Sequence, residues 1–177
     1  MSEIIVSRSS LRSAIASVLP HAGKATDETP QLGKIRWTMT GEGLLLWATD
    51  YNTTVAALVD VVEYQNAELA AWDTTTAVTR KILAVFKASS TRDTDGDLTV
   101  QVTDEQLHIT ETGDLLPGEH LKQPKIKIPT EDDRYPDVAR ILHTALTADV
   151  EPQSHALVDW AHLAAFAPSV KAWGGKA

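Results

Sequence analysis

The pattern of apolar and polar positions predicts a short strand and then a helix at the start of the chain. Residues 4–7 form an apolar run typical of strands. From Ser9 or Ser10, either of which can cap a helix, apolar side chains recur at helical spacing to about Leu19. These side chains are Leu11, Ala14, Ile15 and Val18. Pro20 ends the predicted helix, because proline disfavours helical geometry in the residue before it.

Strands with alternating polarity follow a loop over residues 20–34. The next segment places one set of side chains inward and its neighbours outward; the inward set is Ile35, Trp37 and Met39. A turn at the Gly-Glu-Gly sequence 41–43 leads to a return strand at 44–49. Asp50 and Asn52 favour a second tight turn, because their side chains readily bond nearby backbone. Residues 53–64 are predicted to form a third strand.

A second helix is predicted over residues 80–89, after a short strand at 74–78 and with Thr79 as its cap. Its buried side comprises Ile82, Leu83, Val85 and Phe86, and its polar stripe comprises Arg80, Ala84 and Lys87. Residues 98–102 and 106–110 then read as a hairpin, and residues 125–128 as one more strand. The order of elements predicts an α+β fold, in which an antiparallel sheet carries two helices on one face.

The strand–helix pattern restarts near residue 154, after a connection at 130–152. Residues 156–158 are predicted to form a strand, and a helix is expected from about Trp160. One strand–helix unit cannot close a core of its own. This segment therefore reads as an incomplete repeat of the opening pattern.

Composition narrows the class of protein. The chain has 177 residues, 43% of them apolar, which is enough for a substantial core. It contains no cysteine, so disulfides, thiolate metal sites and cysteine nucleophiles are excluded. There is no apolar run near the roughly 20 residues of a membrane helix, and the first residues lack the apolar core of a secretory signal. We therefore expect a cytoplasmic protein.

Charge raises the question of where the basic residues lie. The formal net charge is −8, from 24 acidic and 16 basic side chains. Proteins that bind nucleic acid tightly are usually basic, but a local basic face can act in an acidic chain.

Other chemistry has little support in the sequence. The sequence DTDGD at 93–97 spaces carboxylates as in a calcium loop, but its glycine is fourth rather than sixth and a strand follows, which favours a turn. The six histidines are scattered, and there is no nucleotide-binding glycine motif or nucleophile elbow. We expect no metal, no cofactor and no enzymatic activity.

Four stretches together resemble the first domain of a bacterial DNA polymerase III sliding clamp, the β subunit. They are LRSAIASVLP, WATD followed by a valine-rich strand, TTTAVTRKILAVFK, and IPTEDDRYPDV. The resemblance lies in their order and spacing. It implies a clamp-like first domain over residues 1–142, a linker at 143–153, and the start of an incomplete second clamp-like domain at 154–177.

The resemblance also implies a function. In sliding clamps, helices line a central hole through which duplex DNA passes, so they need basic side chains but no means of reading bases. The positions implied to contact DNA are Arg12, Lys24, Arg80 and Lys87, with Arg8 and Lys81 as lesser candidates. The positions implied at a subunit interface are Lys81, Phe86, Lys125 and Ile128. The implied partners are double-stranded DNA, a replicative polymerase, a clamp loader and further copies of the chain in a ring.

The acidic residues of the later strands and turns are expected to face away from DNA. They are Asp93, Asp95, Asp97, Asp104, Glu105, Glu111 and Asp114. Two departures from the family pattern stand out: the chain has one domain and a fragment where a clamp subunit has three domains, and the peptide-binding groove of the family would lie outside it.

Two other classes of function stay open. One is a clamp-like interaction module without DNA binding, which predicts a neutral or acidic helix face and an exposed apolar groove. The other is a small hydrolase, which predicts a deep pocket with converging polar groups. A clamp predicts basic side chains gathered on the two-helix face.

Overall fold

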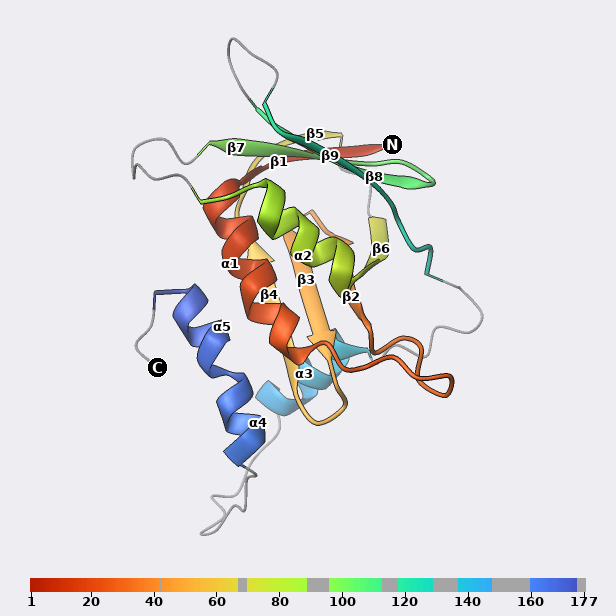
Figure 1. Ribbon diagram of the computed structural model, residues 1–177, viewed down its shortest axis with the longest axis vertical. Coiled ribbons are helices and arrows are strands. Elements are labelled where there is room, and N and C mark those ends of the chain that lie inside the picture. The colour runs from red at the N-terminus through yellow and green to blue at the C-terminus, as the bar shows by residue number, and fades with distance from the viewer. Residues whose placement is uncertain are drawn as a thin grey trace.

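Two antiparallel sheets and a pair of helices form the main body of the computed structural model (Figure 1). The structure describes residues 1–41, 43–66, 70–88, 96–112, 118–128, 137–147 and 160–174. Sheet A contains β1 (Ser2–Ser7), β5 (Val61–Asn66), β7 (Asp97–Val102), β8 (Gln106–Glu111) and β9 (His120–Pro124). Sheet B contains β2 (Lys34–Met39), β3 (Leu44–Thr49), β4 (Thr54–Val59) and β6 (Ala70–Thr75). The helix pair is α1 (Arg8–Val18), continued by a 3-10 turn at Leu19–His21, and α2 (Thr76–Val85).

The strand order shows that the two halves of the chain exchange their first strands. Sheet A runs β5-β1-β7-β8-β9 and sheet B runs β4-β3-β2-β6. The first half has the order strand, helix and four strands, and the second half, from β6, has the order strand, helix and three strands. The first strand of each half lies in the sheet that the other half completes, and β5 crosses to sheet A beside β1. The α+β class, the antiparallel pairing and the two helices on one face are confirmed, with the strands divided between two sheets rather than gathered in one.

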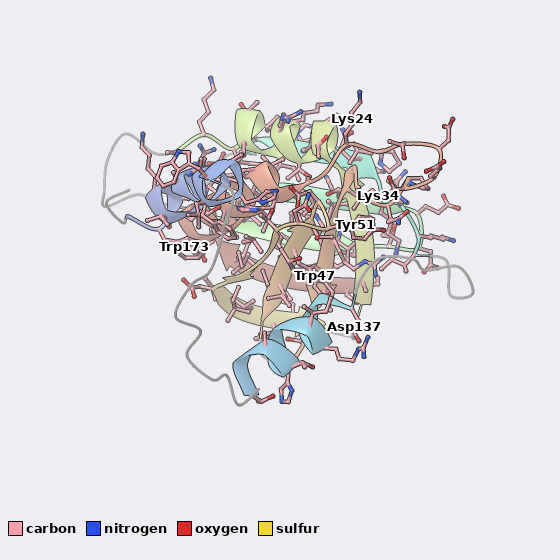
Figure 2. The ribbon with its side chains drawn as sticks, turned by 90° about the horizontal axis from the view of Figure 1, so that it is seen from below. Lys24, Lys34, Trp47, Tyr51, Asp137 and Trp173 are labelled. Carbon is pink, nitrogen blue, oxygen red and sulfur yellow. The ribbon has the colours of Figure 1, made fainter. Side chains whose placement is uncertain are left out.

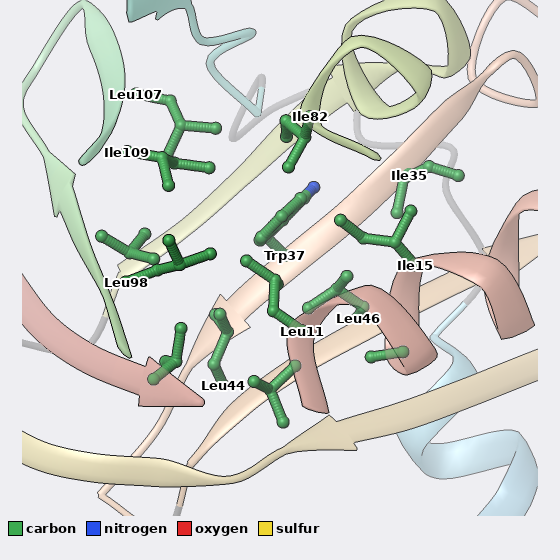
Figure 3. Close-up of a cluster of buried hydrophobic side chains, with 14 of the residues drawn as sticks. Leu11, Ile15, Ile35, Trp37, Leu44, Leu46, Ile82, Leu98, Leu107 and Ile109 are labelled. Atoms are coloured by element: carbon green, nitrogen blue, oxygen red, sulfur yellow. The ribbon is translucent and has the colours of Figure 1, made fainter. Parts of the chain in front are cut away.

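One core joins the sheets to the helix pair (Figure 3). Leu11 and Ile15 from α1 and Ile82 from α2 are at most 1% exposed. They pack in one cluster with inward side chains of both sheets, which include Ile4, Trp37, Leu44, Leu46, Leu98, Leu107 and Ile109. Trp37 and Trp72 stack with their ring centroids 5.8 Å apart. Burial of this apolar surface is the main term that holds the helices on the sheets.

Both helices begin earlier than the sequence pattern predicts. Ser7, rather than Ser9 or Ser10, caps α1, since its hydroxyl accepts from the backbone of Ser10. Thr75, rather than Thr79, caps α2 by accepting from the backbone of Val78 over 3.2 Å. The Thr79 hydroxyl is buried and donates to the Thr75 carbonyl. Since consecutive threonines can all cap, the pairing of β6 with β2 decides where the helix begins.

Two strand predictions are wrong in their bounds. The strand predicted over 53–64 breaks at Asp60, where the chain crosses from sheet B to sheet A. The backbone N–H of Asp60 donates to the Ser10 hydroxyl over 2.8 Å, which fixes this crossing. The strand predicted over 125–128 lies earlier, as β9, which ends at Pro124, and the N–H of Lys125 still donates to the Glu105 carbonyl. Beyond it, Ile126 forms a single bridge with Asp73 of β6.

The tight turn predicted at Asp50 and Asn52 is confirmed, and together with Thr49 it is here called the Thr49–Asp50 corner. Carboxylate oxygen Oδ1 of Asp50 accepts from the backbone N–H groups of Asn52 and Thr53 over 2.9 and 2.6 Å. Tyr51 has φ of 70°, a left-handed geometry that these hydrogen bonds support. This turn joins β3 to β4 and brings the chain back along the sheet.

The C-terminal part of the described chain forms three further helices: α3 (Val138–Thr147), α4 (Trp160–Ala165) and α5 (Ala167–Ala172). Figure 2 shows α3 on the opposite side of the sheets from α1 and α2. It runs across the predicted domain boundary at residue 142. The helix expected from Trp160 is present as two short helices, and the predicted strand at 156–158 lies outside the described residues. Among the described helices, none has the length and apolar character needed to cross a membrane.

Candidate functional site

The helix pair is held together by Arg12, which lies on α1. Its Nη1 atom donates to the carbonyl oxygen of Leu83 over 2.8 Å and also to the carbonyl oxygen of Phe86. These carbonyls belong to the last turn of α2 and to its cap residue. Carbonyl groups at a helix end have no hydrogen-bond partner within the helix. Arg12 is partly buried in this position. It therefore fixes the register of the two helices, a role that the sequence pattern did not indicate.

Four basic side chains are exposed on or beside the helix pair: Lys24, Arg80, Lys81 and Lys87. Within the part of the chain that the structure describes, none of them makes an ion pair. Lys24 belongs to the loop between α1 and β2, and Figure 2 shows it on the side of the molecule that carries α2. The end of this loop adjoins the start of α2, where the backbone N–H of Thr76 donates to the Gly33 carbonyl. The loop and the two helices thus form one continuous surface, here called the helix face.

Lys87 lies beyond the helix on which it was predicted. Helix α2 ends at Val85, and Phe86 is its cap. Arg80 and Lys87 therefore do not form a stripe on one helix, although both are exposed, Arg80 in the middle of α2 and Lys87 just beyond its cap.

The arginines elsewhere on the sheets and helices have partners within the chain. Arg8 pairs with Glu111 of β8 and is 12% exposed in its side chain, so it ties the start of α1 to sheet A. Arg36 pairs with Asp73 through Nε and Oδ1 over 2.9 Å. Both are structural, and Arg8 is therefore a poor candidate for contact with a ligand.

Neither helix of the pair contains an acidic residue, whereas acids are common in the later strands and turns. Of the seven acids predicted to face away from the helices, four lie in the described part: Asp97, Asp104, Glu105 and Glu111. They belong to β7, β8 and the turn between them. Asp93, Asp95 and Asp114 lie outside the described residues, as does most of the calcium-like sequence.

The four residues predicted at a subunit interface do not lie in one environment. The Phe86 side chain is 2% exposed and belongs to the core, so it has no accessible surface for another subunit. Lys81 is exposed on α2. Lys125 and Ile128 line a hollow on the outward side of sheet B.

A buried polar chain runs from the Thr49–Asp50 corner to α5. The Asp50 carboxylate lies 3.0 Å from the Thr53 hydroxyl, which lies 2.9 Å from Nδ1 of His21. Nε2 of His21 lies 3.2 Å from the hydroxyl of Ser169. That hydroxyl donates to the Ser17 carbonyl over 2.7 Å, and the His21 ring packs on Phe166.

Burial and hydrogen bonding set the charge states in this chain. Burial lowers the pKa of His21, and the nearby Asp50 carboxylate opposes that shift. Burial alone would raise the pKa of Asp50, but hydrogen bonds from Thr53 and Asn52 outweigh it, and the net pKa is lowered. The arrangement resembles a hydrolytic triad only in composition. Ser169 gives its proton to a carbonyl, and Thr53 separates the carboxylate from the imidazole, so His21 cannot activate Ser169 as a nucleophile.

The described residues contain no cluster of histidine and carboxylate side chains able to hold a metal ion. His21 was assigned to a loop by its sequence context. Its partner Ser169 is 148 residues away, and no local pattern signals that contact.

Comparison with known proteins shows which fold this is. No protein-family model and no curated protein matches the chain. Solved structures do. The β subunit of DNA polymerase III from Thermotoga maritima aligns with 92% of this chain and 37% of its own length, at 15% identity and a TM-score of 0.56. The sliding clamp of Pseudomonas aeruginosa aligns with 79% of this chain and 34% of its own, at 13% identity and a TM-score of 0.59.

The chain has the fold of a DNA sliding clamp. A third example, the β subunit from Borrelia burgdorferi, aligns with 78% of this chain at 16% identity and a TM-score of 0.56. The predicted resemblance to the clamp family is therefore confirmed at the level of fold. This chain spans about a third of the length of these solved clamps.

Proposed function

We propose that this chain is part of a DNA sliding clamp and that its helix face lies against duplex DNA. One observation carries the proposal: α1 and α2 contain basic residues and no acidic residue, in a chain whose net charge is −8. Random placement of 24 acids among 177 residues would put some on two helices of 11 and 10 residues. Their absence from α1 and α2 favours contact of these helices with a polyanion, while the loop of the helix face carries Asp27 and Glu28 besides Lys24.

The contacts proposed are those of Lys24, Arg80 and Lys87 with phosphates, supported by Lys81. All four side chains are exposed on flexible stems, which suits contacts that shift from one phosphate to the next. Phosphate contacts carry no sequence information, so the contacts proposed here do not depend on the bases. Binding that ignores sequence is what a clamp needs in order to slide.

Arg12 has a different part in this proposal. Because it holds α2 against α1, it positions Arg80 and Lys87 on a common surface. We propose it as a positioning residue that lies close to DNA.

The proposal also covers the enclosure of DNA, the contacts between subunits and the protein partners. A clamp encloses DNA, so this chain would need further domains or further copies to surround a duplex, and it would act in the cytoplasm without enzymatic chemistry. Of the residues predicted at a subunit interface, Lys81 is retained as a proposed contact between subunits, because Lys125 and Ile128 line a separate hollow. The polymerase and the clamp loader are the proposed protein partners.

Charge reversal on the helix face tests the proposal. The variant Arg80→Glu/Lys87→Glu should bind duplexes of unrelated sequence at least about tenfold more weakly at low ionic strength, because it removes phosphate contacts and adds repulsion. The matched control is Lys122→Glu/Lys127→Glu, which makes the same change in charge on β9 and the segment after it. Fluorescence anisotropy of labelled duplexes measures the binding. Equal weakening of duplex binding by the two variants would contradict a specific contact between DNA and the helix face.

Enclosure of DNA needs a second measurement. The assembled protein, loaded on circular DNA, should remain bound in salt that removes simple phosphate contacts, and should leave once the circle is cut. The loss of protein from closed circles at the same rate as from linear DNA would contradict the ring.

A further inference from the structure

A hollow of about 580 Å³ opens on the outward side of sheet B, away from the helix face. Its lining includes outward residues of β2, β3 and β6, namely Arg36, Thr38, Trp47 and Ala71. Lys125, Lys127 and Ile128, from the segment after β9, and Asp104, from the β7–β8 turn, complete the described lining. Nothing in the proposed contact with DNA uses this surface.

The floor of the hollow is rigid and partly apolar. Arg36 and Asp73 form a two-point ion pair, with Nε–Oδ1 and Nη2–Oδ2 distances of 2.9 and 3.3 Å. Their side chains are 8% and 2% exposed, so this pair is satisfied and fixed in place. Trp47 lies opposite Arg36 in the β2–β3 ladder and is 8% exposed. A ligand that enters the hollow would meet Ala71, Ile128 and the small exposed part of the Trp47 ring.

The rim of the hollow carries free positive charge. In the described part of the chain, the side chains of Lys125 and Lys127 make no ion pair. Asp104 is the one acidic residue in the described lining, against two lysines. The excess of positive charge on this rim is complementary to carboxylates.

The rim also has an open strand edge. Ile126 exchanges two backbone hydrogen bonds with Asp73, each 3.0 Å long. Because backbone groups of successive residues point to opposite sides of a strand, those of Lys125 and Lys127 point away from β6. The N–H of Lys125 is taken by the carbonyl of Glu105. Among the described residues, no backbone hydrogen bond involves Lys127, so its N–H and C=O can pair with one residue of another strand.

We propose that this hollow binds an extended acidic peptide segment of a partner protein. The peptide would pair its backbone with Lys127, place carboxylates beside Lys125 and Lys127, and insert an apolar side chain against Trp47. Strand pairing at an edge supplies affinity in such modes, and the side-chain pockets supply specificity. A duplex fits the hollow less well, since the hollow is concave and a duplex surface has no apolar side chain to place against Trp47 and Ile128. This proposal is independent of the DNA role of the helix face.

A titration with a defined probe tests the proposal. The probe is a terminally blocked six-residue peptide that alternates glutamate and leucine, and its comparison is the same peptide with glutamine in place of glutamate. NMR spectra of the full chain should show that the acidic peptide shifts the indole signal of Trp47 and the amide signal of Lys127. The glutamine peptide should bind at least about fivefold more weakly, because it lacks the charges that the lysines attract.

Variants separate this site from the helix face. Lys125→Glu/Lys127→Glu should weaken binding of the acidic peptide at least about fivefold. The control Arg80→Glu/Lys81→Glu should leave peptide binding unchanged, while it weakens DNA binding. Thermal unfolding checks that each variant folds, and Lys125→Gln/Lys127→Gln replaces the double reversal if that variant does not fold.

Four outcomes would overturn the proposal. The two peptides could bind equally, or the lysine variants could bind the acidic peptide as the parent does. Inorganic phosphate or duplex DNA at equal concentration could displace the peptide, which would assign the site to anions or to nucleic acid. The Trp47 signal could shift with protein concentration alone, which would assign the hollow to a second copy of the chain.

Discussion

Arg12 of α1 donates a hydrogen bond from Nη1 to the carbonyl oxygen of Leu83 on α2, over 2.8 Å. The same atom donates to the carbonyl of Phe86, the residue that caps α2. A guanidinium that serves two carbonyls at a helix end stabilises both the end of α2 and its contact with α1. The positions of Arg80 and Lys87 relative to α1 therefore depend on this side chain.

Removal of the Arg12 guanidinium should destabilise the fold. We expect Arg12→Met to lower the free energy of unfolding by about 2 kcal/mol, since hydrogen bonds from a charged donor are lost and buried carbonyls are left unpaired. Urea unfolding measures the change. Arg12→Lys should recover part of it. An unchanged unfolding midpoint in Arg12→Met would show that the contact does not hold the helix pair.

The buried ion pair between Arg36 and Asp73 should be sensitive to the loss of one partner. Asp73→Asn leaves the guanidinium in a nearly closed site, and we expect a loss of about 3 kcal/mol in the free energy of unfolding. The double variant Arg36→Met/Asp73→Leu should lose much less, because no buried charge is left unpaired. If the loss of stability in the double variant equalled the summed losses of Arg36→Met and Asp73→Leu, the two side chains would not form a stabilising pair.

Stability should fall in acid because of His21. Its pKa is lowered by burial, so between that lowered value and about 6.5, the ordinary value, the unfolded chain binds more protons than the folded chain. The contribution of His21 is thus fully present above about pH 6.5 and declines as the pH falls below it. The lowered pKa of Asp50 acts in the same direction at lower pH, below its ordinary value of about 4.

Urea unfolding at a series of pH values measures this effect. The parent minus His21→Gln difference isolates the histidine, and we expect the variant to lose less stability between pH 7.5 and 5.5. Parallel curves for the two proteins across that range would contradict the burial of His21.

Ser169 should anchor α5 to the main body. It is the buried residue of that helix, and its hydroxyl contacts both Ser17 and His21. We expect Ser169→Ala to lower the stability of α5 by about 1 kcal/mol and to speed amide exchange in residues 160–174, with little change in sheets A and B. Thr144→Ala, at an exposed position on α3, is the matched control. Unaltered exchange in 160–174 would show that α5 is held by other contacts.

The fold was largely predictable because its periodic signals are local. Leu11 and Ile15 repeat at helical spacing, and Ile35 and Trp37 alternate, so the element types follow from short windows of sequence. The ends of elements were less predictable. Three successive threonines could each cap α2, and the choice of Thr75 depends on strand pairing with β2.

The candidate site was predictable in its charges and not in its contacts. Arg80 is exposed as the helix pattern implied, Lys87 is exposed but lies beyond α2, and Lys24 is exposed in its loop. The contact of Arg12 is with Leu83, which is 71 positions away in the chain. The burial of Phe86 depends on the closure of the core. The exchange of first strands between the two halves also has no local signal, since it arises only when both halves are present.

The most direct test of the central claim is an NMR titration of this chain with short duplexes of two unrelated sequences at low ionic strength. We predict that amide signals of α1, α2 and the loop around Lys24 shift, that both sequences shift the same signals, and that added salt reverses the shifts. Shifts confined to the outward sides of the sheets, or a marked difference between the two sequences, would contradict a helix face built for sliding on DNA.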